Sequence, residues 1–109
     1  MEPLRAADLA VLDELSWLPS DYVEWLHRHG FGEVAKEAGT YMLYSAPVQL
    51  SEFCTGAPQE AWTFGDDFSG YNACFIEGGD GTVHEWDSAF AEMRAIGKRF
   101  PEFIKKWHT

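Results

Sequence analysis

The stretch Tyr71–Trp86 reads YNACFIEGGDGTVHEW and carries the strongest local fold signal of the chain. Its first part, Tyr71–Glu77, is mostly apolar and contains aromatic residues, which is typical of a strand. Three glycines and an aspartate follow at Gly78–Gly81, and glycine can adopt the positive φ angles that tight turns require. The next part, Thr82–Trp86, has the composition of another strand. The stretch therefore predicts an antiparallel β-hairpin.

Further strands are expected upstream of this hairpin. Tyr41–Tyr44 and Ala61–Phe64 are short apolar runs bordered by loop residues, which indicates two more strands. Gly65–Gly70 is expected to be a turn, and Phe31–Thr40 a loop with a short strand near its middle. Pro47–Phe53 is expected to form a short helix that begins at its proline.

Helices are predicted towards both ends of the chain. Asp8–Leu15 carries leucines at three-residue spacing, which fits a short amphipathic helix. A second helix is expected to begin at Pro19, because proline is well tolerated at the first helical position, and to end at Gly30 in a left-handed conformation. Ser88–Ile96 and the segment from Phe100 to Trp107 also show helical apolar spacing and are predicted to be helices.

The order of these elements, helices then strands then helices, favours an α+β fold over a parallel βαβ arrangement. We expect one domain over residues 1–109, built on a mainly antiparallel four- to six-stranded sheet flanked by helices. The chain is long enough for one hydrophobic core and too short for two. Its composition, 46% hydrophobic and 16% aromatic, argues against intrinsic disorder.

Acidic residues dominate the charge, because 18 Asp and Glu stand against 8 Lys and Arg and give a formal net charge of −10. Phosphates and anionic membranes repel such a chain, so neither nucleic acid nor a membrane is an expected partner. A basic protein is attracted instead, and this attraction raises the association rate. Solubility alone is the competing explanation for the charge. Met1–Arg5 lacks the layout of a signal peptide and no apolar run has the length of a membrane span, so a cytoplasmic location is expected.

Patterns for catalysis or metal binding are weak. His84, Glu85 and Asp87 form the densest cluster of potential ligands, but on a strand the histidine points to one face and the carboxylates to the other. Cys54 and Cys74 match no metal or redox spacing, and whether they lie close in space stays open. We therefore expect a binding protein rather than an enzyme, with no cofactor and no metal. The sequence does not define the oligomeric state.

Five acidic residues around the predicted turns and the end of the hairpin are the candidate partner-binding positions: Asp66, Asp67, Asp80, Glu85 and Asp87. An aspartate in a turn more often caps the backbone than takes part in catalysis, and its charge still favours a basic partner. Trp62 lies beside a loop and is a candidate aromatic anchor, as is Trp17, because aromatic residues are enriched at interaction hot spots.

Four stretches together carry a resemblance to a known family: Leu18–Gly30, Tyr41–Leu50, Phe64–Trp86 and Ala95–Ile104. The first looks like an "LP-x-dy" helix followed by glycine, and the last like a closing "sF-x-eF" helix. In this order and spacing they resemble the SUKH superfamily, bacterial immunity proteins related to the fungal cell-wall assembly regulators Smi and Knr. The chain departs from the family in its short N-terminal region and in Arg99, where members often have a small polar residue.

The resemblance implies an α+β sheet domain flanked by helices, without catalysis. It also implies a partner, because many members neutralise a polymorphic toxin, often a nuclease or deaminase, by binding it inside the producing cell. The charge fits such a role independently, since an acidic protein can cover the substrate channel of a basic toxin and compete with phosphate. The alternative is a non-enzymatic regulatory scaffold that binds a cellular protein unrelated to toxins.

Overall fold

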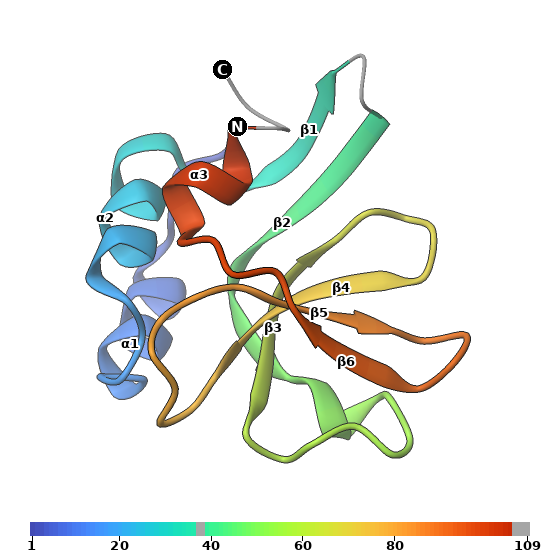
Figure 1. Ribbon diagram of the computed structural model, residues 1–109. Helices are drawn as coiled ribbons and strands as arrows, with labels where there is room; N and C mark the ends of the chain where they lie inside the picture. The colour runs from blue at the N-terminus through green and yellow to red at the C-terminus, as the bar shows by residue number, and fades with distance from the viewer. Residues whose placement is uncertain (37–38, 106–109) are drawn as a thin grey trace.

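Over residues 1–36 and 39–105 the chain forms an α+β domain with one six-stranded antiparallel sheet and three helices, which confirms the expected fold class. The computed structural model describes residues 1–36 and 39–105. The elements in chain order are α1 (Ala6–Glu14), α2 (Ser20–His29), β1 (Gly32–Lys36), β2 (Gly39–Gln49), the 3₁₀ turn η1 (Leu50–Glu52), β3 (Ala61–Asp66), β4 (Tyr71–Ile76), β5 (His84–Asp87), β6 (Glu92–Ala95) and α3 (Phe100–Ile104). Figure 1 shows the helices gathered on one side of the molecule and the sheet on the other.

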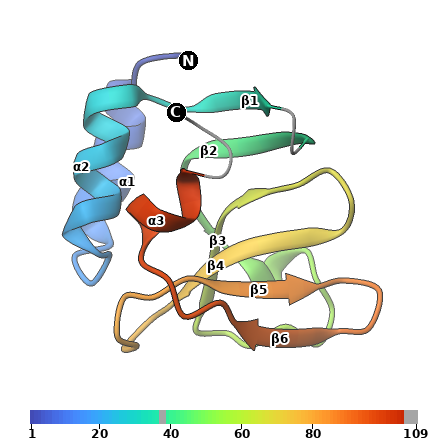
Figure 2. The same cartoon turned by 45° about the horizontal axis from the view of Figure 1, so that its top comes forward.

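The sheet is a simple meander, because its strands lie in the order β1-β2-β3-β4-β5-β6 and each pairs with the next along the chain. The predicted hairpin of Tyr71–Trp86 is confirmed as β4 and β5, which pair with Asn72 opposite Trp86 and Cys74 opposite His84. Two irregularities interrupt the ladder, one in β2 between Leu43 and Val48 and one in β3 between Thr63 and Gly65. Bulges of this kind bend a sheet and increase its twist. Figure 2 shows the sheet from a second direction.

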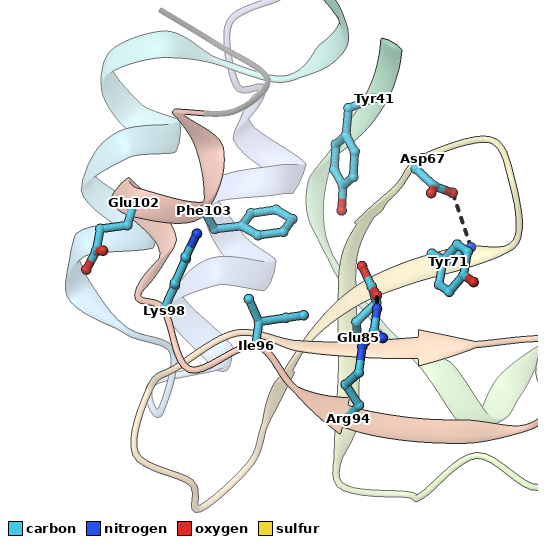
Figure 3. A pocket seen from close by; sticks show the side chains of 9 residues that line it. All are labelled: Tyr41, Asp67, Tyr71, Glu85, Arg94, Ile96, Lys98, Glu102 and Phe103. Carbon is cyan, nitrogen blue, oxygen red and sulfur yellow. Dashed lines mark hydrogen bonds and ion pairs between the residues drawn. The ribbon is translucent and has the colours of Figure 1, made fainter. Parts of the chain in front are cut away.

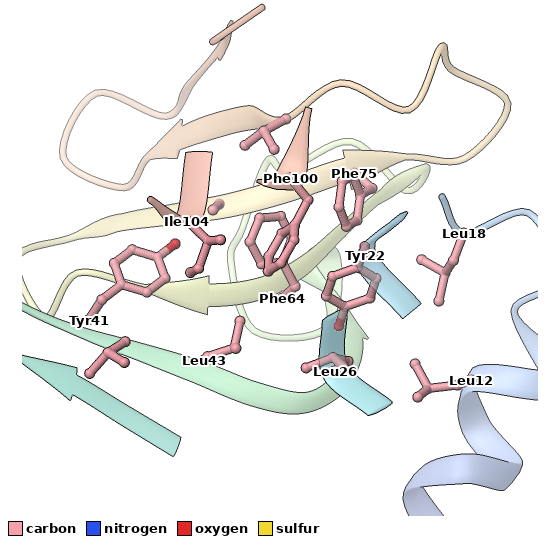
Figure 4. Packing of buried hydrophobic residues seen from close by; sticks show 13 residues of the cluster. Leu12, Leu18, Tyr22, Leu26, Tyr41, Leu43, Phe64, Phe75, Phe100 and Ile104 are labelled. Atoms are coloured by element: carbon pink, nitrogen blue, oxygen red, sulfur yellow. The ribbon is translucent and has the colours of Figure 1, made fainter. Parts of the chain in front are cut away.

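The main core lies between the three helices and one face of the sheet (Figure 4). Tyr22 of α2 is its centre: its ring centroid lies 5.0 Å from that of Phe75 and 5.0 Å from that of Phe100. Phe64 stacks on Phe75 with ring centroids 4.6 Å apart. Aromatic pairs at such distances add stabilisation beyond the area that they bury. This cluster joins α2, α3, β3 and β4, so a helix from each end of the chain packs against the two strands in its middle.

A second cluster covers the opposite face of the sheet. Leu50, Ala61, Cys74 and Trp86 are buried there, and the segment after η1 packs against them through Cys54 and Ala57. The two cysteines therefore lie in the same apolar cluster, and both carry free thiols. Burial raises the pKa of the Cys74 thiol to about 12, so at neutral pH it is a protonated, apolar core group.

Helix α2 ends at Gly30, as predicted, but in a different conformation. Gly30 has φ +82° and ψ −157°, which is the mirror image of extended backbone rather than a left-handed helical turn. A side chain here would collide with the N-terminal segment, since an added Cβ would lie 2.0 Å from the carbonyl oxygen of Glu2. At the other end Pro19 precedes the helix as its N-cap instead of occupying the first turn.

Three local predictions are wrong because strand pairing decides these segments. Ser88–Ile96 is not a helix: a turn leads into β6, whose backbone pairs with β5. Phe31–Thr40 is mainly strand rather than loop, because β1 pairs with the start of β2. Pro47–Phe53 continues β2 to Gln49 and forms only the 3₁₀ turn η1. In each case hydrogen bonds to a neighbouring strand outweigh the local preference, which is helical for Ser88–Ile96 and Pro47–Phe53 and that of a loop for Phe31–Thr40.

The terminal helices match their predictions more closely. α1 covers Ala6–Glu14 and buries Leu12 in the main core. α3 begins one residue before Pro101 and buries Phe100 and Ile104. The predicted extension of this helix to Trp107 lies outside the described residues. No helix within residues 1–36 and 39–105 has the length and apolar character that a membrane span needs.

Candidate protein-binding site

A pocket lies on the helix-bearing face of the sheet, between α3 and the strands β4, β5 and β6 (Figure 3). Its volume is about 250 Å³. Three aromatic, five charged and one aliphatic residue line it: Tyr41, Tyr71, Phe103, Asp67, Glu85, Arg94, Lys98, Glu102 and Ile96. The lining comes from five parts of the chain, so only the folded sheet and α3 together create the pocket.

Strand register places the charged floor of this pocket. Glu85 stands opposite Ala73 on one side and opposite Arg94 on the other. Directly opposed residues in antiparallel strands point to the same face, and Ala73 belongs to the helix-side core. Glu85 and Arg94 therefore also face the helix side, where the Arg94 guanidinium donates a hydrogen bond to the Glu85 carboxylate. This bond and the Glu85 charge raise the pKa of Arg94 above its usual value.

The aromatic wall lies above this ion pair. Tyr41 of β2 and Phe103 of α3 meet edge to face with ring centroids 5.7 Å apart, and in Figure 3 they approach each other from opposite sides of the pocket. Only 3% of Tyr41 is exposed, and burial raises the pKa of its hydroxyl well above the usual value. The Tyr41 hydroxyl is thus uncharged at neutral pH, whereas the rim of the pocket carries Lys98 and Glu102 at exposed positions.

Asp67 closes the pocket at the turn after β3. Its Oδ1 accepts hydrogen bonds from the backbone amides of Ser69, at 2.8 Å, and of Tyr71, at 3.2 Å. The predicted capping role of this aspartate is therefore correct. The same bonds fix the turn, so the Asp67 charge and the Tyr71 ring hold defined positions beside the Glu85–Arg94 pair.

Asp66 lies beside Asp67 but points to the other face of the sheet. Its Oδ2 accepts a hydrogen bond from the Tyr44 hydroxyl at 2.6 Å, and its Oδ1 accepts one from the amide of Phe68 at 2.9 Å. Burial raises the pKa of Tyr44, and the bond to Asp66 raises it further. The buried Asn72 amide donates to Thr63 Oγ1 at 3.1 Å and completes this polar network.

The other predicted positions spread over the molecule. Asp87 lies at the same end as Asp66 and Asp67, where it caps the turn after β5. Asp80 lies in the loop at the opposite end of β4 and β5, where hydrogen bonds from the Thr82 side chain and amide lower its pKa. Trp62 is half-buried against Trp17, with ring centroids 6.0 Å apart, and donates a hydrogen bond to Glu77. The structure therefore places Asp66, Asp67, Glu85 and Asp87 towards one end of the sheet, with Asp66 on the opposite face from Asp67, and leaves Asp80 and Trp62 apart from them.

Sequence reasoning missed most of the pocket lining, above all Arg94. The three-residue spacing of Phe90, Met93 and Ile96 predicted a helix, in which Arg94 and Glu85 would not be neighbours. The signal for β6 was the alternation of charged Glu92 and Arg94 with apolar side chains, which is the period of a strand.

Comparisons with known proteins add no assignment, since no protein-family model matches this chain, and no significant match was found among the curated proteins or the solved structures. The resemblance to the SUKH superfamily therefore stays a prediction that rests on the order of the sequence motifs. Among residues 1–36 and 39–105, no group of three or more His, Cys, Asp or Glu side chains is arranged to hold a metal ion.

Proposed function

We propose that this protein is a non-enzymatic, immunity-type binding protein that neutralises a cognate polymorphic toxin by direct protein–protein contact in the cytoplasm. The toxin is proposed to be a basic domain that acts on nucleic acid. Three features support the proposal: the formal net charge of −10, the SUKH-like order of motifs, and the pocket between α3 and β4–β6.

The observation that carries the proposal is the lining of that pocket. Three carboxylates, Asp67, Glu85 and Glu102, surround a hollow walled by aromatic rings, and two cations, Arg94 and Lys98, balance them only in part. Cationic side chains are attracted to carboxylates and to aromatic faces, so a lysine or arginine of a partner finds both there. Phosphate would meet net negative charge at the same place.

Inhibition follows from competition for the partner's basic surface. A protein that degrades or modifies nucleic acid binds its substrate through lysines and arginines that contact phosphates. An acidic protein that covers these residues excludes the substrate sterically and electrostatically. Such a complex forms rapidly at low salt and weakens as added ions screen the charges.

The direct test is to co-express the chain with the product of the adjacent open reading frame and to measure their affinity at about 50 mM and about 500 mM NaCl. The expected result is a complex that salt weakens and that suppresses the partner's activity on nucleic acid. Glu102→Gln, at the rim of the pocket, is expected to weaken binding at low salt. Glu14→Gln on α1 removes the same charge from an exposed site away from the pocket and serves as the matched control.

A Glu102→Gln variant that binds as tightly as the Glu14→Gln control would argue against the pocket. If the neighbouring product does not bind, and the chain instead forms a defined complex with a cellular protein that has no toxic activity, the regulatory scaffold is the better description.

A further inference from the structure

The end of the sheet next to the pocket carries two exposed aromatic side chains. Phe68 lies in the turn between β3 and β4, and Phe90 lies in the turn between β5 and β6. They are 57% and 74% exposed, the two highest values among the large hydrophobic residues that the structure describes. Both side chains are thus in contact with solvent, and burying either ring against a partner would lower the free energy.

The two turns are tied to each other. Ser88 donates hydrogen bonds from its hydroxyl, at 2.8 Å, and from its amide, at 3.0 Å, to the carbonyl oxygen of Gly70. Figures 1 and 2 both show the two turns at the same end of the sheet. The two turns, one with Phe68 and the other with Phe90, therefore lie side by side at one end of the sheet, which we call the hairpin-tip surface (residues 66–70 and 87–92).

Aspartates hold both phenylalanines in place through the backbone. The amide of Phe68 donates to Asp66 Oδ1 at 2.9 Å, and the amide of Phe90 donates to Asp87 Oδ1 at 3.4 Å. Phe68 also has φ +64°, a left-handed conformation that costs a bulky residue about 1 kcal/mol and that asparagine or glycine adopts more easily. Fold stability alone therefore favours a different residue at position 68.

The charged residues around Phe68 and Phe90 determine which kind of protein surface can bind there. The hairpin-tip surface contains Asp66, Asp67, Asp87 and Glu92 and no lysine or arginine. Asp87 and Glu92 stand directly opposite each other in the register of β5 and β6, and like charges in such a pair repel. A second copy of this chain would bring four carboxylates against four others, whereas a basic surface would neutralise them.

We infer that the hairpin-tip surface is a docking site for a basic protein surface that has an apolar depression rimmed by lysine or arginine, with Phe68 and Phe90 as its anchors. The inference deepens the proposed function and rests on it only for the identity of the partner. In this arrangement the aspartates are positioning residues that also attract the partner, and the phenylalanines supply most of the affinity, as aromatic hot-spot residues do.

The test uses the full chain with the photo-crosslinking residue p-benzoylphenylalanine in place of Phe90, in cells of the natural host that co-express the adjacent gene product. The same residue in place of Phe53 is the control, because Phe53 is 55% exposed and follows η1 at the other end of β3. A basic protein crosslinked from position 90 and not from position 53 is the expected result. Crosslinks to lipid, to a second copy of the chain, to an acidic protein, or to nothing overturn the inference.

Affinity measurements with the crosslinked protein, purified, then quantify the anchors. Phe68→Asn and Phe90→Ser are each expected to weaken binding at least about tenfold, whereas Phe53→Ser leaves it unchanged. Phe68→Asn is also expected to keep or raise the melting temperature, because asparagine tolerates the positive φ, whereas replacement of a phenylalanine with a purely structural role would lower it.

Phe68→Asn and Phe90→Ser variants that bind the neighbouring gene product as tightly as the parent chain overturn this inference and leave the proposed function standing. A salt-sensitive complex with a different basic protein that needs Phe68 and Phe90 supports the inference and contradicts the toxin assignment.

Discussion

Arg99 donates a hydrogen bond from Nε to Oδ2 of Asp21 at 2.8 Å and so connects two residues that are 78 positions apart. Arg99 precedes α3 and Asp21 lies in the first turn of α2, so the contact joins the first and last parts of the core. The same guanidinium donates from Nη1 to the carbonyl oxygen of Asp80 at 3.3 Å. One side chain thus fixes α2, α3 and the loop between β4 and β5.

The first prediction concerns this link. Arg99→Ala is expected to lower the free energy of unfolding by about 1 kcal/mol, since an exposed ion pair contributes little but the Asp80 bond is lost as well. The loss exceeds that of a simple surface pair because Asp21 Oδ1 is buried without a hydrogen-bond partner among the described residues. Urea unfolding measures the change. The control is Arg28→Ala, whose ion pair with Glu24 is solvated on both sides; a loss as large from this variant would contradict the special role of Arg99.

Removal of the hydroxyl group by a Tyr→Phe substitution is expected to have opposite effects on stability at Tyr22 and Tyr44. The Tyr22 hydroxyl is fully buried and has no hydrogen-bond partner within residues 1–36 and 39–105, so Tyr22→Phe is expected to keep or raise stability by up to about 1 kcal/mol. The Tyr44 hydroxyl donates to Asp66 at 2.6 Å, so Tyr44→Phe is expected to lower stability by about 1 to 2 kcal/mol.

Thermal and urea unfolding of both variants test this pair of predictions under identical conditions. If Tyr22→Phe is the more destabilising of the two, its hydroxyl has a partner that the described residues do not reveal.

Stability is also expected to depend on pH in the alkaline range. Burial raises the pKa of Cys74 from its ordinary 9.0 to about 12, so folding favours the protonated thiol. This contribution is complete below pH 9.0, the ordinary value, and is lost as the pH rises towards about 12. The free energy of unfolding should fall by roughly 1.4 kcal/mol per pH unit above the ordinary thiol value. Tyr22 and Tyr41, whose pKa values burial also raises, add to the fall at higher pH.

Urea midpoints measured from neutral pH upwards, at steps of half a pH unit or so, check this dependence. Cys74→Ala is expected to remove most of the fall that begins near pH 9.0, and Cys54→Ala, with the less buried thiol, much less of it. Equal slopes for the parent chain and Cys74→Ala would refute the assignment.

The last prediction concerns the end of α2. Gly30→Ala is expected to lower stability by about 2 kcal/mol or more, because its Cβ would collide with a backbone carbonyl in addition to the strain of the positive φ. The displaced residue is Glu2, whose backbone pairs with Phe31 through two hydrogen bonds of 2.8 Å. Hydrogen exchange at the Phe31 amide should therefore accelerate. Gly56→Ala is the control, since Gly56 has φ +86° with open space around it and tests strain alone.

The parts of the fold that the sequence predicted are those with strong local signals. The hairpin of β4 and β5 follows from glycines at its turn, and α2 from Pro19 and Gly30 at its ends. β6 was missed because three apolar residues at helical spacing outweighed a short alternating pattern. β6 is an edge strand that forms its backbone hydrogen bonds with β5. Local sequence propensity contains no information about this pairing partner.

The candidate site likewise contains residues that the sequence predicted and residues that it did not. Asp67 and Glu85 were selected for their charge and their nearness to turns, and both line the pocket. Phe90 was expected on the apolar face of a helix, yet it is the most exposed large hydrophobic side chain of the described chain. Its exposure depends on the turn that joins β5 to β6. Because a helix was predicted for Ser88–Ile96 instead of this turn and β6, the sequence did not indicate the hairpin-tip surface.

The α+β class, the antiparallel hairpin, the excess of negative charge and the supply of aromatic residues for a core depend on composition and on neighbours along the chain, so they can be predicted without the fold. Which charged side chains meet depends on tertiary contacts. Strand register sets Glu85 opposite Arg94, the packing of α3 brings Phe103 to Tyr41, and a hydrogen bond links the turns that contain Phe68 and Phe90 at one end of the sheet. The physical reason is that pairing and packing act between residues distant in sequence, where one step of register moves every side chain of a strand to the other face.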